Sequence, residues 1–506
     1  MDSLKTNPVL WIGLAICLPL ATWGLVAPTA MSEAVLGFTT FFMVGASWWW
    51  LLLATFFLIF VAVLALGPWG RLKLGADDEE PEFSTASWLS MLFAGGMGAG
   101  LLFWGVAEPV THFDNPPGMD GGTAQAARFA MVLTNLHWGL HAWAIYGVCA
   151  LIIAYFTFRC DRPMRISAPL RGMIGGRAEP VVKTGADVLG IVAVAFGLAG
   201  SLSMGTLQVR SGLGVVFALP ETTLVSLLVL AVLYLAYMTS TLTGVDKGMR
   251  LLSNINMAIA LAVMAFILVT GPTRFILETV VDTIGAYFFS LGVMAFRLLP
   301  YEGLTEWSAT WTLTYLIWWL AWGPFVGVFI ARISRGRTIR EFCAGVILLP
   351  TLFSIVWFAV FGGAGIYAEL FGPGGLAALV NENVSEALFA FLAYFPLAEV
   401  LSYLAMILIF IFLVTSADSG TFVLSMMSSG GSLDPPANAK LVWGSVVAVI
   451  TAATLLSGSV EVARAMATLG AIPFSAVLML WLAGFFRALG KEDLTGKKAS
   501  TREASS

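Results

Sequence analysis

Charged residues are scarce in this chain of 506 residues. Lys, Arg, Asp and Glu make up 11% of it, against about a quarter of an average soluble protein. Hydrophobic residues make up 59%, which excludes a disordered chain and a soluble enzyme. The net charge is −4 and the isoelectric point is near 5.5, so no basic surface indicates nucleic-acid binding. The composition predicts an all-α polytopic membrane protein.

Residues with special chemistry are also few. The four cysteines show no paired spacing, which indicates neither disulfides nor a metal site: Cys17, Cys149, Cys160 and Cys343. Three histidines are too few for a redox or metal enzyme: His112, His137 and His141. No phosphate-binding loop, nucleophile elbow, HExxH motif or dinucleotide fingerprint occurs. We therefore do not expect an enzyme.

Long apolar runs predict twelve membrane spans. They cover residues 8–28, 45–67, 85–107, 131–158, 186–207, 222–240, 250–271, 310–331, 342–368, 397–425, 440–458 and 469–487. The first run lacks a basic leader and a cleavage site, so we interpret it as an uncleaved span. A further apolar segment at 276–298 is interrupted by Glu278, Asp282 and Arg297. We expect this segment to be an interfacial helix.

Lys and Arg gather on one side of the predicted spans. Of the 26 such residues, 21 lie in the loops after even-numbered spans or in the two tails, and five lie on the opposite side. Because cytoplasmic loops carry the excess of Lys and Arg, we predict cytoplasmic termini in a plasma-membrane protein. The tail at 490–506 is short and polar, and we expect it to be disordered.

Glycine is concentrated in the third predicted span. Gly95, Gly96, Gly98 and Gly100 fall within six residues. Such a run weakens a helix and can free backbone carbonyls, which transporters use to bind ions and solutes. The alternative is close helix packing on small residues. From the residues alone, the two interpretations are equally supported.

Three tryptophans stand together in the eighth predicted span. Trp318 and Trp322 fall on one helix face, with Trp319 about 100° away. Pro324 and its neighbouring glycines are expected to bend or break this helix. Aromatic rings attract a quaternary ammonium or sulfonium ion, at roughly 0.5–2 kcal/mol per ring. Trp also belts membrane interfaces, but three beside a helix break favour a cation site.

The fourth predicted span carries Trp138, Trp143 and Tyr146. Trp143 and Tyr146 are three residues apart and share a helix face. Each ring taken singly is more typical of an interfacial aromatic. Together they are also compatible with a second set of rings around a cation.

The tenth predicted span contains Thr415, Ser416 and Asp418. Hydroxyl and free carbonyl oxygens suit a hard cation such as Na⁺. Hydrogen bonding between helices is the commoner use of Ser and Thr in membranes. We expect Asp418 to be a buried, hydrogen-bonded carboxylate rather than a direct ligand.

Four ordered motifs resemble the betaine/choline/carnitine transporter (BCCT) family. They are GMGAGLLFWGVAEP at 96–109, HWGLHAWAIY at 137–146, the run at 311–342 and TSADSG at 415–420. The resemblance covers residues 8–489 and implies a homotrimer with the sodium-symporter-like (LeuT-type) fold of two inverted five-helix repeats. It divides the chain into an N-terminal part with two extra helices at 1–84, a first repeat at 85–271, a periplasmic interfacial helix at 272–309, a second repeat at 310–489 and a cytoplasmic tail at 490–506.

The resemblance also implies site residues. The central aromatic box would be Trp318, Trp319 and Trp322, and the second set of rings Trp138, Trp143 and Tyr146. The solute would also contact Met97, Gly98, Ala99 and Gly100. Na⁺ would be bound by the carbonyls of Ala94, Met97 and Phe412 and the hydroxyls of Thr415 and Ser416.

The mode of coupling follows from the same comparison. Sodium-independent exchangers of the family lack the hydroxyl pair and place a basic side chain nearby. This chain keeps Thr415 and Ser416 and has the uncharged Asn256 in span seven, which favours sodium coupling. A second sodium site of some members uses two threonines in span five, where Val194 and Leu198 stand here. The stoichiometry is therefore open.

We expect a secondary transporter that imports a betaine-like methylated onium zwitterion by Na⁺ symport with alternating access. Candidate solutes are glycine betaine, choline, carnitine and dimethylsulfoniopropionate. The alternatives are a sodium-independent exchanger and an osmolyte sensor that does not transport. A channel is disfavoured because no filter-like loop occurs. The expected partners are the solute, membrane lipids and further copies of the chain, with no nucleic acid.

Overall fold

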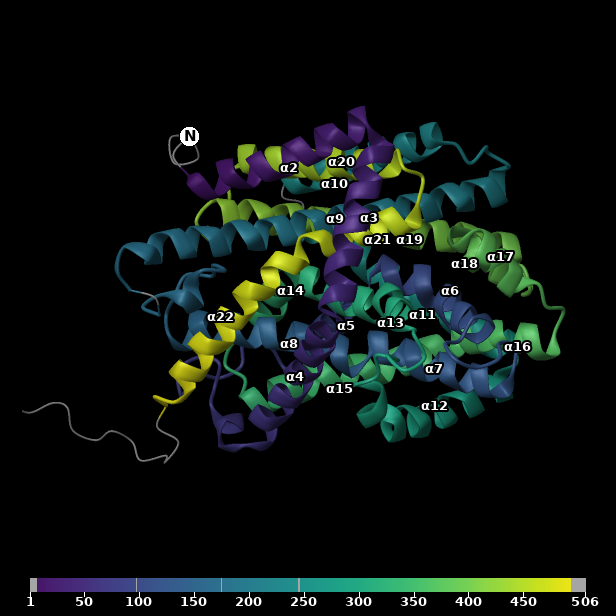
Figure 1. The fold of residues 1–506 in the computed structure, drawn as a ribbon, viewed down its shortest axis with the longest axis horizontal. Coiled ribbons are helices and arrows are strands. Elements are labelled where there is room, and N and C mark those ends of the chain that lie inside the picture. The colour runs from purple at the N-terminus through teal and green to yellow at the C-terminus, as the bar shows by residue number, and fades with distance from the viewer. Residues whose placement is uncertain (1–6, 97, 174, 244–245, 493–506) are drawn as a thin grey trace, which may run out of the picture.

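The computed structural model describes residues 7–96, 98–173, 175–243 and 246–492, and every regular element in these ranges is a helix. Most long helices run along the long axis of the molecule, whereas α3 crosses them (Figure 1). The first half contains α2 (Pro8–Val26), α3 (Pro28–Gly45), α4 (Ser47–Leu66), α5 (Thr85–Gly96), α6 (Ala99–Asp114), α7 (Ala124–Trp138), α8 (Leu140–Ala154), α9 (Glu179–Phe217), α10 (Thr223–Thr243) and α11 (Asp246–Thr270).

The second half begins with α12 and ends with α22. Its helices are α12 (Thr273–Met294), α13 (Thr305–Ser308), α14 (Thr314–Ile333), α15 (Ile339–Phe358), α16 (Ala364–Phe371), α17 (Leu376–Glu382), α18 (Ala387–Leu392), α19 (Ala398–Ser428), α20 (Ala437–Leu455), α21 (Val460–Leu469) and α22 (Ala471–Leu489). Wider π-helical turns occur at Tyr155–Arg159, Ala309–Leu313 and Ala359–Gly363. Such turns are frequent at functional sites.

Within the described residues, twelve helical segments are long and apolar enough to cross a membrane, which confirms the polytopic all-α prediction. One predicted span is missing from this set, and one helix that was not predicted to span the membrane is included. The third predicted span is divided into α5 and α6, each too short to count, and α12 takes its place by length and composition. Asp282 in the middle of α12 pairs with the exposed Arg128 near the start of α7. The interfacial position of α12 stays a prediction, as does the division into two repeats.

The third and fourth spans are both interrupted. Between α5 and α6, Gly98 has extended backbone angles, as the glycine run indicated. The fourth span, predicted to be continuous, is divided at Gly139 between α7 and α8. A side chain at Gly139 would place its Cβ 2.4 Å from the Asn135 carbonyl oxygen and 2.9 Å from the Tyr287 hydroxyl. Only glycine fits this close approach.

Two other helix limits differ from those expected. The eighth span was expected to bend or break at Pro324, but α14 continues through it as one helix to Ile333. The lost hydrogen bond is tolerated because this stretch packs against α8, where Gly323 faces the sulfur of Cys149. In addition, the segment between the first two spans, which was not assigned to a helix, forms α3 and packs on α21.

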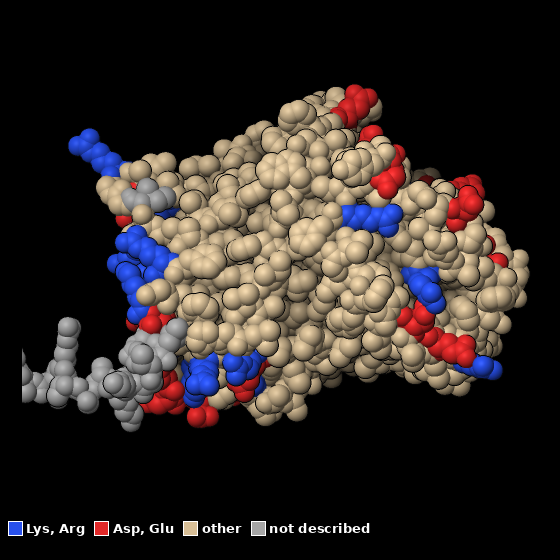
Figure 2. Space-filling model, turned by 60° about the horizontal axis from the view of Figure 1, so that its bottom comes forward, with Lys and Arg blue, Asp and Glu red and all other residues tan. Residues whose placement is uncertain are grey.

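On the surface, the charged residues lie mainly at the two ends of the molecule. On the face shown in Figure 2, a broad band without Lys, Arg, Asp or Glu separates them, and Lys and Arg gather at the left end. At the cytoplasmic end predicted above, Arg159 donates hydrogen bonds to Glu492 at 2.7 and 2.8 Å and to Asp77 at 2.8 Å. The predicted tail is described only as far as Glu492, and the prediction of disorder falls on residues outside the described ones.

Candidate functional site

Five of the six predicted aromatic rings form one connected group, which we call the Trp319 group. Helix α14 packs along α8, and Trp319 lies edge-on to Trp138 and Tyr146 at centroid distances of 5.0 and 5.3 Å. Trp318 is nearly parallel to Trp319 at 6.3 Å. Trp143 contacts Tyr146 at 5.7 Å. The rings of the fourth and eighth spans therefore form one cluster inside the protein, which does not fit an interfacial belt.

Hydrogen bonds fix three indoles of the Trp319 group. Trp319 donates its Nε1–H to the carbonyl oxygen of His137 at 2.7 Å, just before the break at Gly139. Trp318 donates to the Ser201 hydroxyl at 3.3 Å, and Trp138 donates to Glu108 Oε2 at 2.7 Å. A ring whose N–H is bound in this way keeps one orientation, so these ring faces are preorganised.

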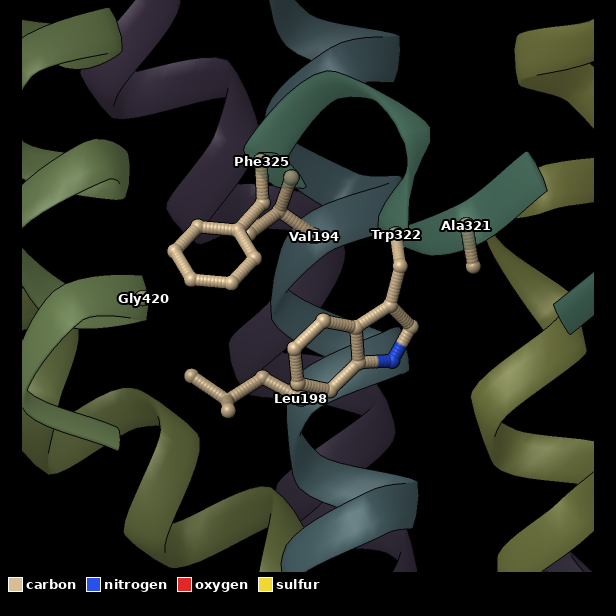
Figure 3. Close-up of a pocket in the computed structure, with 6 residues that line it drawn as sticks. All are labelled: Val194, Leu198, Ala321, Trp322, Phe325 and Gly420. Carbon is tan, nitrogen blue, oxygen red and sulfur yellow. The ribbon is translucent and has the colours of Figure 1, made fainter. Parts of the chain in front are cut away.

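Trp322, the sixth predicted ring, lies apart from this group. Its nearest aromatic contact is Phe325 at 5.3 Å. The two rings line an apolar cavity together with Val194, Leu198, Ala321 and Gly420, and Figure 3 shows both rings facing it. The Nε1–H of Trp322 is buried and has no hydrogen-bond partner among the described residues. Val194 and Leu198, which stand where some family members have sodium-binding threonines, are thus walls of this cavity.

The helix break in the third span contacts the Trp319 group. A Cβ at Gly100 would lie 3.1 Å from the Trp138 ring, so the glycine lets the start of α6 approach the indole. Gly98 and Ala99 are half-buried beside it. Met97, predicted to contact both solute and Na⁺, lies outside the described residues. The described part of the segment predicted to contact the solute, Gly98 to Gly100, therefore lies next to the rings.

The predicted sodium ligands of the tenth span lie on α19, which packs against α6. The Thr415 hydroxyl donates to the Phe412 carbonyl at 3.1 Å, which places these two oxygens side by side. Ser416 is half-buried on the next position. Ala94 is in the last turn of α5, and its side chain is outside the described part. The oxygen chemistry suits Na⁺, and the complete ligand set stays a prediction.

Asp418 follows the hydroxyl pair along α19. Its carboxylate accepts a hydrogen bond from the Thr241 hydroxyl of α10, and it is half-buried rather than buried. The prediction of a hydrogen-bonded carboxylate is confirmed in that respect. The bond joins α19 to α10, which is a structural role.

A buried polar cluster lies directly behind the Trp319 group and was missed by sequence reasoning. Glu108 Oε1 is 2.6 Å from His137 Nδ1 and 3.5 Å from His112 Nε2. His137 Nε2 is 3.0 Å from the Thr312 hydroxyl. The side chains of Glu108, His112 and His137 have no exposed surface. The signal was present: Glu108 and His112 are four residues apart, and an intramembrane carboxylate is a functional candidate by default.

Arg464 is a buried cation near this cluster. It is one of the five Lys and Arg residues that were predicted to lie on the side opposite the termini. Its guanidinium lies over the rings of Trp311, Trp104 and Tyr315, at 4.6, 5.2 and 5.6 Å from their centroids. Its Nη2 donates to the Thr310 carbonyl at 2.7 Å.

Comparison with known proteins identifies the family. Residues 8–494 match the model of the BCCT, betaine/carnitine/choline family transporter. The chain is 40% identical to the glycine betaine transporter OpuD of Bacillus subtilis, over 97% of this chain and 96% of the relative. It is 38% identical to an ectoine/hydroxyectoine transporter of Virgibacillus pantothenticus, over 97% of each. It is 37% identical to a probable glycine betaine transporter of Desulfitobacterium hafniense, over 96% and 98%. The chain therefore belongs to the betaine/carnitine/choline transporter family, whose members are membrane transporters and not enzymes.

Proposed function

We propose that this protein imports a betaine-like zwitterion with a methylated ammonium or sulfonium group, by Na⁺ symport with alternating access. The observation that carries the proposal is the contact between the Trp319 group and the helix break at Gly98–Gly100. The rings supply faces for the cation, and the break supplies polar backbone. A zwitterion needs both at once.

The cationic end fits the ring faces. A methylated onium group has no N–H to donate, so it gains more from ring faces than from hydroxyls or carboxylates. Each desolvated ring contributes roughly 0.5–2 kcal/mol. Because the indoles of Trp138, Trp318 and Trp319 are already fixed by hydrogen bonds, little ordering is needed when the cation binds.

The anionic end fits the start of α6. This helix of 16 residues begins at Ala99 directly after the extended Gly98. Its first backbone N–H groups have no partner within the helix, and the helix dipole is positive there. A carboxylate bound at this end would lie close to the Trp138 ring, because Gly100 approaches that ring. Discontinuous helices hold anionic groups of transported solutes in this way.

Sodium coupling is supported by the oxygen pair of Phe412 and Thr415 on α19 and by the packing of α19 on α6. In the double variant Thr415→Ala/Ser416→Ala, the Na⁺ concentration for half-maximal uptake should rise at least about tenfold, because two oxygen ligands are lost. Ser425→Ala on the same helix, whose hydroxyl only donates to the Thr421 carbonyl, is the matched control. An unchanged Na⁺ dependence in the double variant would place the ion elsewhere.

The oligomer is part of the proposal. Helix α12 carries a stripe of exposed apolar side chains that are four or eight residues apart and so share one helix face. Val281 is 72% exposed, Phe289 91% and Val293 71%. We propose that this stripe helps to form a homotrimer at the outer membrane surface. Light scattering of the detergent-purified chain measures the protein mass, and a monomer would contradict this part.

The test of function is uptake into proteoliposomes. Labelled glycine betaine, choline, carnitine, dimethylsulfoniopropionate and ectoine are each supplied with an inward Na⁺ gradient, and K⁺ replaces Na⁺ in the control. We expect accumulation of a methylated onium zwitterion only with the gradient. Uptake that ignores Na⁺ and needs preloaded solute would indicate an exchanger, and accumulation of ectoine alone would overturn the methylated-onium class.

A further inference from the structure

The cluster behind the aromatic rings has a composition that transport of an onium solute does not require. Glu108, His112 and His137 each offer one ligand atom, and these three atoms lie within 4.8 Å of one another. We propose that the three side chains bind a divalent transition-metal ion such as Zn²⁺, and that the bound ion arrests transport.

The donor set and spacing suit zinc. Two imidazole nitrogens and one carboxylate oxygen form the protein part of many zinc sites that keep a fourth position open. Ligand bonds of about 2.0–2.2 Å in a tetrahedron place the ligand atoms about 3.4 Å apart. His112 Nε2 and Glu108 Oε1 are 3.5 Å apart. His137 Nδ1, now 2.6 Å from the same oxygen, needs to withdraw by less than about 1 Å.

The buried imidazole of His112 is poorly satisfied by hydrogen bonds. This side chain has no exposed surface; its Nδ1 has no hydrogen-bond partner within the described residues, and its Nε2 has only the long contact of 3.5 Å with Glu108 Oε1. A buried polar group without a partner is destabilising. The ring is held from outside by Trp307 and Trp311, at centroid distances of 5.8 and 4.7 Å. A metal ion beside Glu108 would satisfy the nitrogen that faces it.

The surrounding groups orient the ligands as metal sites require. His137 Nε2 is 3.0 Å from the Thr312 hydroxyl, which fixes the ring with Nδ1 toward Glu108. The second carboxylate oxygen of Glu108 accepts from Trp138 at 2.7 Å. Bonds of this kind from outside the ligand set tune metal affinity and orientation. When the metal binds, the His137 proton moves from Nδ1 to Nε2 and is donated to Thr312, so no net proton is lost from this ring.

A cavity lies beside the cluster, toward the end of the molecule away from the termini. His112 is two residues before the end of α6, whose loop to α7 is at the right of Figure 1. A cavity reaches from Arg297 to Thr312 and Trp307, the neighbours of His137 and His112. The ion can therefore arrive from this side when the pathway opens.

One charge opposes the metal and limits its affinity. The Arg464 guanidinium lies 4.6 Å from the Trp311 centroid, on a ring that His112 also contacts. It repels a second cation through Coulomb interaction in a poorly screened region. We expect binding weaker than that of a closed structural zinc site, and reversible with a chelator. A bound ion would move His137 away from Glu108, and because these two residues hold the indoles of Trp319 and Trp138, it would distort the rings and so arrest transport.

The experiment combines transport with metal binding by the full chain. Zn²⁺ is added outside proteoliposomes during uptake of the solute, and Co²⁺ binding is followed by its visible absorption in detergent without solute. The wild type should be inhibited by micromolar Zn²⁺ and recover with chelator. His112→Ala should keep uptake and need at least about tenfold more Zn²⁺, because a ligand is lost. His141→Ala removes the remaining histidine, which lies near Thr55, and should behave as wild type.

Two results would overturn the proposal: a wild type that neither binds Co²⁺ nor responds to Zn²⁺, or a His112→Ala protein as sensitive as the wild type. His112→Gln, which keeps the side-chain volume, replaces His112→Ala if the latter does not fold. The Co²⁺ spectrum requires no transport, so failure of the sodium-coupled function and failure of the metal site are distinguished.

Discussion

The Trp319 group and the cavity at Trp322 both contain tryptophans of α14, but they differ in how the indole N–H groups are bonded. In the first part, the indole N–H groups of Trp138, Trp318 and Trp319 are bound to Glu108, to Ser201 and to the carbonyl of His137. The indole N–H of Trp322 has no partner within the described chain, and its cavity is lined by apolar side chains. The first part is therefore rigid and selects a shape, whereas the second can adapt.

The largest effect is expected in the rigid part. Trp319→Leu should weaken binding of the onium solute at least about thirtyfold, because it removes a ring face worth roughly 0.5–2 kcal/mol and the edge contacts that orient Trp138 and Tyr146. Calorimetric titration of the detergent-purified protein measures this. Trp48→Leu, at a ring that is 59% exposed, is the control. If both variants bind alike, the Trp319 group is not the solute site.

A smaller loss is expected in the adaptable part. Trp322→Leu should weaken binding about tenfold, because one ring face is lost without disturbing the others. Trp322→Phe keeps a face and should retain most of the affinity. Trp49→Leu, at a half-buried ring in α4, should have little effect. Equal losses in Trp322→Leu and Trp49→Leu would remove Trp322 from the site.

The hydrogen bond behind the rings should have a lesser effect. Glu108→Gln should weaken binding about three- to fivefold, since a charged acceptor for Trp138 becomes a neutral one at a cost near 1 kcal/mol. The effect should nearly vanish in a Trp138→Phe background, which has no indole N–H to orient. A double-mutant cycle by the same titration tests this. Additive losses would show that Glu108 does not act through Trp138.

A charge contact far from both parts should leave binding unchanged. Hydrogen bonding by Arg159 lowers the pKa of the Glu492 carboxyl from its ordinary value of 4.5, so the contact stabilises the fold above that pH and is lost as the pH falls through the lowered value. Glu492→Gln should lower stability at pH 7 by at most about 1 kcal/mol, and the difference from wild type should disappear in acid. Thermal unfolding in detergent at the two pH values measures this. A changed solute affinity would contradict the separation of the two ends.

Hydropathy was enough to predict the number of spans, because apolar length is a local property of the sequence. The break at Gly139 was not predictable, since one glycine in an apolar run gives no indication of the Tyr287 hydroxyl that approaches it. The continuity of α14 through Pro324 was missed for the same reason: packing against α8 decides it. Helix α3 fell between two apolar runs and has no strong pattern of its own.

The site was predicted to different extents. Aromatic residues clustered in sequence identified five rings that meet in space and also Trp322, which is one helical turn beyond Trp318 and faces a different cavity. The polar cluster was missed because its members come from α6, α7 and α21, and only tertiary packing unites Glu108, His137 and Arg464. The spacing of four between Glu108 and His112 was the one signal in the sequence, and nothing in it connected these two residues to His137 and Arg464.

The two interruptions at Gly98 and Gly139 have a mechanical consequence. They bound residues 99–138, a hairpin of α6 and α7 whose two arms pack on each other and are joined by the bond between Glu108 and His137. Each end of this hairpin is a joint where the helical ladder is already broken, so the hairpin can tilt as one lever with strain confined to two pivots. Trp138 belongs to the hairpin, whereas Trp319 lies outside it on α14 and donates to the His137 carbonyl at the second pivot. Tilting of the lever therefore changes how Trp138 is placed against Trp319.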